Sequence, residues 1–127
     1  MKFITKKSLG QNFLINEKIL NLIVDLGEIK NTDTVLEVGP GTGNLTGKIL
    51  SKNPKNLFVI EKDKRLITQL SQKFKEKIKL YNEDILKFSY QSIDNKKLII
   101  YGNLPYNIST QILVSWIRLD NLNNFCK

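Results

Sequence analysis

The sequence has no histidine and a single cysteine, Cys126. Without histidine there is no histidine-ligated metal site and no Ser-His or Cys-His catalytic pair. One cysteine excludes an internal disulfide and gives no metal-binding spacing. No apolar run approaches the ~20 residues of a membrane-spanning helix, and no secretory signal is visible. We therefore expect a cytoplasmic protein with no metal and no membrane partner. We also expect a monomer.

Arginine is also scarce, with only Arg65 and Arg118, although the net charge is +8. Lysine supplies nearly all of the positive charge. An excess of this kind is typical of proteins that bind nucleic acid. It is equally explained by codon bias, because lysine, asparagine and isoleucine are all abundant. The charge alone does not separate these two interpretations.

The 127 residues fit one domain or part of one, and a hydrophobic share of 41% is enough for a core. Short apolar runs predict strands over 34–38, 56–60, 78–81 and 97–101. Helical spacing follows three predicted caps, Asn16, Asn44 and Asp63. A short turn is predicted near 85–88, and a last helix is predicted from the spacing of Ile112, Leu113, Trp116 and Ile117. This order predicts an α/β fold with a parallel sheet and helices on both faces.

A polar residue lies at or just after the end of each predicted strand: Glu37, Glu61, Asp84 and Asn103. In a parallel sheet these points share the carboxyl edge, where open α/β sheets bind ligands. Any one of them alone would be explained as a cap or a solvated loop residue. Four in successive units favour a ligand site.

The loop after the first strand reads "GPGTG" and carries Gly39, Gly41 and Gly43. Glycines let the backbone turn sharply and approach a ligand closely. The spacing differs from the dinucleotide fingerprint, because Thr46 occupies the slot of its third glycine. A tight strand–helix turn with no ligand would also use glycines, so the loop is weak evidence by itself.

Glu61 lies where a ribose-binding carboxylate is expected relative to this loop, and it would repel a 2′-phosphate. Asp84 could accept the amino protons of an adenine; a cap of the short turn after it is the alternative, and both can hold. An adenosine-bearing cofactor without phosphates fits this set, and S-adenosylmethionine is such a cofactor.

The stretch "NLPY" (103–106) follows the fourth predicted strand. The Asn103 side-chain oxygen and the Leu104 carbonyl can accept the two hydrogens of an adenine amine and direct its lone pair at a methyl group. Pro105 has no N–H to compete, and Tyr106 offers a face for stacking a base, worth roughly 1–3 kcal/mol. No strong base is required, since the amine becomes acidic once methylated. The alternative is a simple turn with the tyrosine in the core.

These motifs together strongly resemble the S-adenosylmethionine-dependent rRNA adenine N6-methyltransferase family, and most closely its small-subunit branch. The resemblance runs through "LGQNFL", "VLEVGPGTGNLT", "VIEKD", "NEDIL" and "YGNLPYNIST". It implies a Rossmann-like methyltransferase fold and dimethylation of two adjacent adenines near the 3′ end of small-subunit (16S) rRNA during ribosome maturation. The alternatives are the large-subunit, macrolide-resistance branch, which Leu104 in place of isoleucine mildly disfavours, and a non-catalytic module that binds cofactor or RNA.

The resemblance also implies roles for single residues. Asn12, Leu14 and Gly41 would contact the cofactor, and Gly39 would approach its methionine part. Glu61 would bind the ribose and Asp84 the adenine. Asn103 would border both the cofactor and the target base, and Tyr106 would stack on that base. The implied partner is small-subunit rRNA in the immature subunit, met by Lys2, Lys6, Lys7 and the run "KFKEKIK" (73–79). That run is otherwise a solvated helix end, which is slightly favoured.

The family's members are substantially longer than this sequence. We therefore expect residues 1–127 to correspond to the N-terminal, cofactor-binding part of a methyltransferase domain, with a fold incomplete at the C-terminus and without the later strands and the C-terminal helical domain. We expect the fourth strand to become an exposed sheet edge. We also expect little or no methyl transfer by this chain alone.

Overall fold

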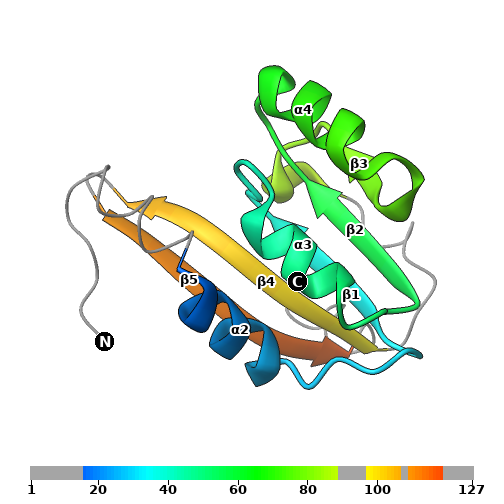
Figure 1. Ribbon diagram of the computed structural model, residues 1–127. Coiled ribbons are helices and arrows are strands. Elements are labelled where there is room, and N and C mark those ends of the chain that lie inside the picture. Colours follow the sequence, from blue (N-terminus) through cyan, green and yellow to red (C-terminus); the bar gives the residue numbers. More distant parts are fainter. Residues whose placement is uncertain (1–15, 89–96, 107–108, 119–127) are drawn as a thin grey trace.

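The structure is a computed structural model that describes residues 16–88, 97–106 and 109–118 (Figure 1). These residues form α-helices, short 3-10 helices and strands. In chain order they are α2 (Glu17–Leu26), β1 (Thr34–Val38), α3 (Asn44–Leu50), β2 (Asn56–Ile60), α4 (Lys64–Phe74), η1 (Lys75–Lys77), β3 (Lys79–Tyr81), η2 (Ile85–Lys87), β4 (Lys97–Tyr106) and β5 (Ser109–Arg118). No helix among them has the length and apolarity needed to cross a bilayer.

The strands form one sheet in the order β3-β2-β1-β4-β5. The first four run parallel, and β5 runs antiparallel to β4. The chain moves outward from β1 to β2 and β3 and then returns to β1's other side, which is the strand order of Rossmann-like folds and creates a switch point between β1 and β4. The predicted α/β fold with a parallel sheet is confirmed.

Alternating strand residues divide the core between the two faces of the sheet. On one face, α2, α3 and α4 pack against a cluster that includes Val35, Leu57, Val59, Ile99 and Tyr101. On the other face, η2 and Phe88 cover a smaller cluster that includes Leu36, Phe58, Ile60 and Leu98. The burial of strand residues on both faces explains why the strands read as continuous apolar runs.

Helix caps agree with the sequence at two positions and differ at a third. The side chain of Asn16 accepts hydrogen bonds from Lys18 N and Ile19 N, and that of Asp63 accepts one from Arg65 N. The prediction that Asn44 caps α3 was wrong: Gly43 is the cap, and Asn44 is the first helical residue. Gly43 has φ 94°, a left-handed conformation that glycine adopts without cost.

The last predicted helix was also wrong, because residues 109–118 form β5. This segment is rich in β-branched and aromatic residues, which favour strands, and its apolar run fits either structure. Pairing along ten residues of β4 satisfies backbone groups that β4 would otherwise expose. The expectation that the fourth strand forms a sheet edge is therefore overturned: β4 lies between β1 and β5, and the edges are β3 and β5.

Candidate ligand site at the carboxyl edge of the sheet

The strand register places three of the predicted site residues side by side. Val38 pairs with Ile60 and with Gly102, and Ile60 pairs with Tyr81, so these four residues form one row across the sheet. The next residues along β1, β2 and β4 are Gly39, Glu61 and Asn103. They therefore share the carboxyl edge, as the sequence predicted for Glu61 and Asn103.

The loop Gly39–Gly43 turns through left-handed conformations at each of its three glycines. Gly39 N donates to Ile60 O at 3.0 Å, which continues the β1–β2 ladder one residue past the strand. A Cβ at Gly43 would lie 2.6 Å from Phe74 Cε2, so Gly43 is needed for packing. A Cβ at Gly41 would meet no atom within 4 Å. The backbone at Gly41 thus borders open space and can be approached by a ligand.

Glu61 is held in place by the turn that starts α4. Its side chain is 8% exposed, and its Oε2 accepts a hydrogen bond from Asp63 N at 2.8 Å. Asn82 Nδ2 donates to the Glu61 carbonyl at 2.9 Å, which ties the end of β2 to the loop after β3. Oε1 makes no hydrogen bond within the described part of the chain. Asp63 thus fixes the orientation of the carboxylate, and the oxygen Oε1 can accept a hydrogen bond from a hydroxyl group of a ligand.

Asp84 lies three residues beyond Tyr81, the end of β3, and is half-buried. Its carbonyl accepts a hydrogen bond from Lys87 N at 2.9 Å, so its backbone closes the η2 turn. Its carboxylate lies 3.8 Å from Lys62 Nζ. The turn that the sequence offered as an alternative role is therefore present.

Glu37 behaves differently from the other strand-end acids, because its side chain is 1% exposed and lies beneath α3. Thr46 Oγ1 donates to Glu37 Oε1 at 2.5 Å. Oε2 is buried and has no hydrogen-bond partner among the described residues. Burial raises the pKa of Glu37 to about 7; the Thr46 hydrogen bond opposes this rise, and the charge of Glu61 adds to it.

Sequence reasoning missed the partnership of Glu37 with Thr46. It considered Thr46 only as a departure from a glycine fingerprint. The available signal was positional: a threonine in the first turn of the helix that follows a strand can reach back to the strand's last inward-facing residue. That residue here is Glu37, on the same side of β1 as the buried Val35.

The remaining predicted site residues are either not described by the structure or described only by their backbone pairing. Asn12 and Leu14 lie outside the described residues. Residues 103–106 belong to β4, where Asn103 pairs with Ile112 of β5 and Pro105 with Thr110. The register with β1 ends at Gly102. The "NLPY" stretch thus continues β4 past the end of β1 and is not the simple turn that the sequence left open.

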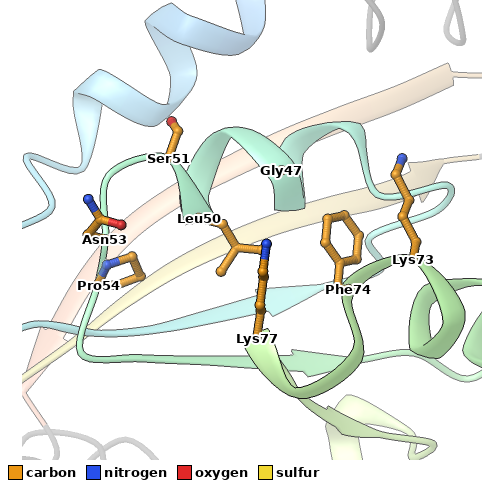
Figure 2. Close-up of a pocket in the computed structure, with 8 residues that line it drawn as sticks. All are labelled: Gly47, Leu50, Ser51, Asn53, Pro54, Lys73, Phe74 and Lys77. Carbon is orange, nitrogen blue, oxygen red and sulfur yellow. The ribbon is translucent and has the colours of Figure 1, made fainter.

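A separate groove of about 700 Å³ lies between α3 and α4 (Figure 2). It is lined by Gly47, Leu50, Ser51, Asn53, Pro54, Lys73, Phe74 and Lys77. Half of these residues lie in α3 or α4, and the other half follow the two helices toward the amino edge of the sheet. The groove therefore contains none of the strand-end residues.

The fold is shared with solved methyltransferase structures. The crystal structure of the 23S rRNA methyltransferase ErmE matches with a TM-score of 0.57 and 23% identity, over 73% of this chain and 48% of that one. A dimethyladenosine transferase from Plasmodium falciparum matches with a TM-score of 0.56 and 25% identity, over 69% of this chain and 42% of that one. These likenesses support the Rossmann-like methyltransferase fold.

Sequence comparison is more specific. The "Ribosomal RNA small subunit methyltransferase A" of Pelagibacter ubique (strain HTCC1062) is 56% identical over 112 residues, which cover 88% of this chain and 42% of the relative. The protein of the same name from Malacoplasma penetrans (strain HF-2) is 46% identical over 123 residues, 96% of this chain and 44% of the relative. The chain thus spans less than half the length of these relatives. The model of the ribosomal RNA adenine dimethylase family matches residues 2–125, so the chain belongs to this family.

Proposed function

We propose that this chain is the cofactor-binding part of an S-adenosylmethionine-dependent enzyme that dimethylates two adjacent adenines near the 3′ end of 16S rRNA. The similarity to relatives named for the small subunit, at 56% and 46% identity, carries the proposal. The site adds independent support, since a glycine loop, a carboxylate and an asparagine meet at one edge of the sheet.

The residues of this edge fit the cofactor. Gly41 borders open space, so its backbone can approach a ligand, and Glu61 has a buried carboxylate with one oxygen that no described residue occupies. When bound, S-adenosylmethionine supplies a methyl group on a positively charged sulfonium sulfur. In the proposed arrangement Glu61 accepts hydrogen bonds from the ribose hydroxyls, and Asp84 accepts a hydrogen bond from the adenine amino group. Gly39 lies against the methionine part. Asn12 and Leu14 complete the contacts.

The target adenine would be handled by residues 103–106. The Asn103 side-chain oxygen and the Leu104 carbonyl accept the two amine hydrogens and orient the nitrogen lone pair, while Tyr106 stacks on the base. The register between β1 and β4 ends at Gly102, so no residue of β1 pairs with residues 103–106. Catalysis of this kind depends on orientation and preorganised hydrogen bonds and needs no histidine.

The proposed partner is small-subunit rRNA within the immature subunit, met by a cytoplasmic, monomeric protein. Two lysines of the run 73–79 are already engaged within the chain. Lys73 Nζ donates to Thr42 O at 3.3 Å, and Lys79 Nζ donates to Asn56 Oδ1 at 3.0 Å. These contacts support the solvated, structural interpretation of that run over a role in binding phosphates.

The test is a transfer assay with labelled S-adenosylmethionine and immature small subunits, followed by mapping of the modified adenines. Label on adjacent adenines near the 3′ end of 16S rRNA supports the proposal. Label on large-subunit rRNA would support the large-subunit alternative instead. Binding of the cofactor without transfer is the result expected if this chain binds the cofactor and transfer needs the rest of the longer relatives' chain. Failure to bind the cofactor at all would refute the proposal.

A further inference from the structure

The carboxyl group of Glu37 is enclosed by ionisable and polar groups from three neighbouring elements. Thr46 of α3 donates to Oε1, Glu61 follows β2, and Tyr101 is the residue of β4 that pairs with Glu37 in the sheet. Oε2 is buried and has no donor among the described residues. An ionised carboxylate with a buried, unpaired oxygen is costly.

A proton on Glu37 removes this cost in the free chain. Burial raises the pKa of this group to about 7, so both the protonated and the ionised form of Glu37 are present near pH 7. The surrounding groups do not change this picture. Glu61 disfavours a second negative charge nearby, and Tyr101 stays neutral because burial and the charges of Asp25 and Glu37 raise its pKa to about 12.

A cation bound at the glycine loop would favour the ionised form of Glu37 over the protonated form. Glu37 is two residues before Gly39, a separation of about 7 Å along a strand. For a unit positive charge about 7 Å from a carboxyl, at an effective dielectric constant of about 20, the pKa of that carboxyl falls by more than about one unit. No direct contact is needed, so the buried position of Glu37 is no obstacle.

We propose that Glu37 releases its proton to the solvent when the chain binds S-adenosylmethionine, and that the resulting carboxylate acts as the counter-charge of the sulfonium. This inference rests on the proposed function, because it takes the cofactor from there. In the step the O–H bond of the Glu37 carboxyl breaks, the proton goes to water or buffer, and no oxidation or reduction occurs. Thr46 is a positioning residue, since its hydroxyl stabilises the carboxylate that forms.

Calorimetry of binding at pH 7, in two buffers of different ionisation enthalpy, measures the protons released. The expected value for S-adenosylmethionine is a fraction of a proton per ligand, because part of the Glu37 population is protonated beforehand. S-adenosylhomocysteine, in which an uncharged thioether replaces the sulfonium, should release markedly less. Glu37→Gln should release almost none with either ligand. Glu76→Gln, an exposed position in η1, is the matched control and should behave like the unchanged chain.

The Thr46→Val substitution tests the inference through the direction in which the number of released protons changes. Loss of the Thr46 hydrogen bond raises the pKa of Glu37 further, because that bond favours the charged form. More Glu37 is then protonated at pH 7, so the proton release should increase toward one per ligand. A merely structural role for Thr46 would weaken binding without changing this number.

Binding of S-adenosylmethionine with no proton release, or with the same release in Glu37→Gln, would overturn the inference and leave the proposed function intact. Absence of binding by the unchanged chain would instead refute the proposed function, and the inference with it. Should Glu37→Gln not fold, carbon-13 NMR of the glutamate carboxyls in the unchanged chain decides. The Glu37 midpoint must fall when S-adenosylmethionine is added, and an unmoved midpoint contradicts the inference.

Discussion

The hydroxyl of Tyr101 in β4 donates a hydrogen bond to the carbonyl of Val24 in α2, with 2.7 Å between the oxygens. The two residues are 77 positions apart in the chain, and both are buried. The same carbonyl accepts a hydrogen bond from Gly27 N at 3.1 Å. This contact fixes the end of α2 over the centre of the sheet, on the strand pair that also carries Glu37.

Tyr101→Phe removes one of the two donors to the Val24 carbonyl and keeps the buried ring. Because Gly27 N still satisfies that carbonyl, we expect a loss of about 1 kcal/mol in the free energy of unfolding. Urea denaturation followed by circular dichroism measures this, and the slope of the transition should not change. An unchanged midpoint would show that the hydrogen bond does not stabilise the packing of α2.

Gly27→Ala should destabilise the chain although the backbone there is ordinary, with φ −80°. An added Cβ would collide with the Tyr101 hydroxyl oxygen and lie 3.0 Å from Cζ. We expect a cost of roughly 1–3 kcal/mol, typical of overpacking. The double variant with Tyr101→Phe removes the colliding oxygen and should recover part of the loss, so the two effects should not be additive. Simple additivity would contradict the proposed collision.

Substitution by alanine at Gly43 and at Gly47 should change the stability of the chain in opposite directions. At Gly43, φ is 94° and a Cβ would lie 2.6 Å from Phe74, so Gly43→Ala should cost more than about 1 kcal/mol. At Gly47 the nearest atom lies 4.0 Å away and the residue is helical, so Gly47→Ala should stabilise by about 0.5–1 kcal/mol. Thermal melts of the two variants provide the comparison, and equal shifts would argue against both assignments.

Glu37 should make the stability of the chain fall as the pH rises from about 5 to about 7. Its ordinary pKa is 4.5 and burial raises it to about 7, so between these values the folded state holds a proton that the unfolded state has lost. The contribution lost over this range is about 3 kcal/mol. Urea titrations at several pH values, compared between the unchanged chain and Glu37→Gln, isolate it. Parallel pH profiles for the two proteins would show that Glu37 ionises normally.

Glu61→Gln should weaken binding of S-adenosylmethionine by roughly ten- to a hundredfold, the loss expected when an acceptor of a charged hydrogen bond is removed. The amide oxygen of glutamine can still accept from Asp63 N, so the fold should be retained. Calorimetry gives the dissociation constant, and circular dichroism checks the fold. Unchanged affinity with an intact fold would remove Glu61 from the cofactor site.

Much of the fold follows from local sequence patterns. The predicted strands 34–38 and 56–60 have the observed bounds, and 78–81 is within one residue of Lys79–Tyr81. Helix α2 also starts at the predicted cap. The apolar spacing of α2 does not show which side of the helix is buried, since Leu22 and Leu26 are 60% and 65% exposed while Leu20 and Val24 are buried. Apolar spacing predicts a helix, but the neighbouring elements decide which side of it is covered.

The segment 109–118 shows where local patterns stop being sufficient. Its apolar residues fit a helix or a strand, and the outcome depends on the open edge of β4, a partner that spacing within the segment does not reveal. Residues 103–106 were likewise expected to follow the fourth strand, and pairing with β5 makes them part of it. Both errors arise because strand pairing is a contact between segments.

By itself, the sequence determined the family, because the motifs that carry it are local. It also determined the order of the parallel strands along the chain, because short apolar runs and helix caps are local patterns. The shared edge of Glu61 and Asn103 followed, because parallel strands end at one edge of the sheet. Only the tertiary structure decided that Glu37 and Glu61, two similar strand-end acids, have different surroundings. Glu37 lies beneath α3 with one oxygen bound by Thr46 and the other unpaired, while Glu61 is oriented by the turn into α4. The physical reason is that burial and hydrogen bonding, which set the charge of a carboxyl, are properties of the packed neighbours and not of the residue.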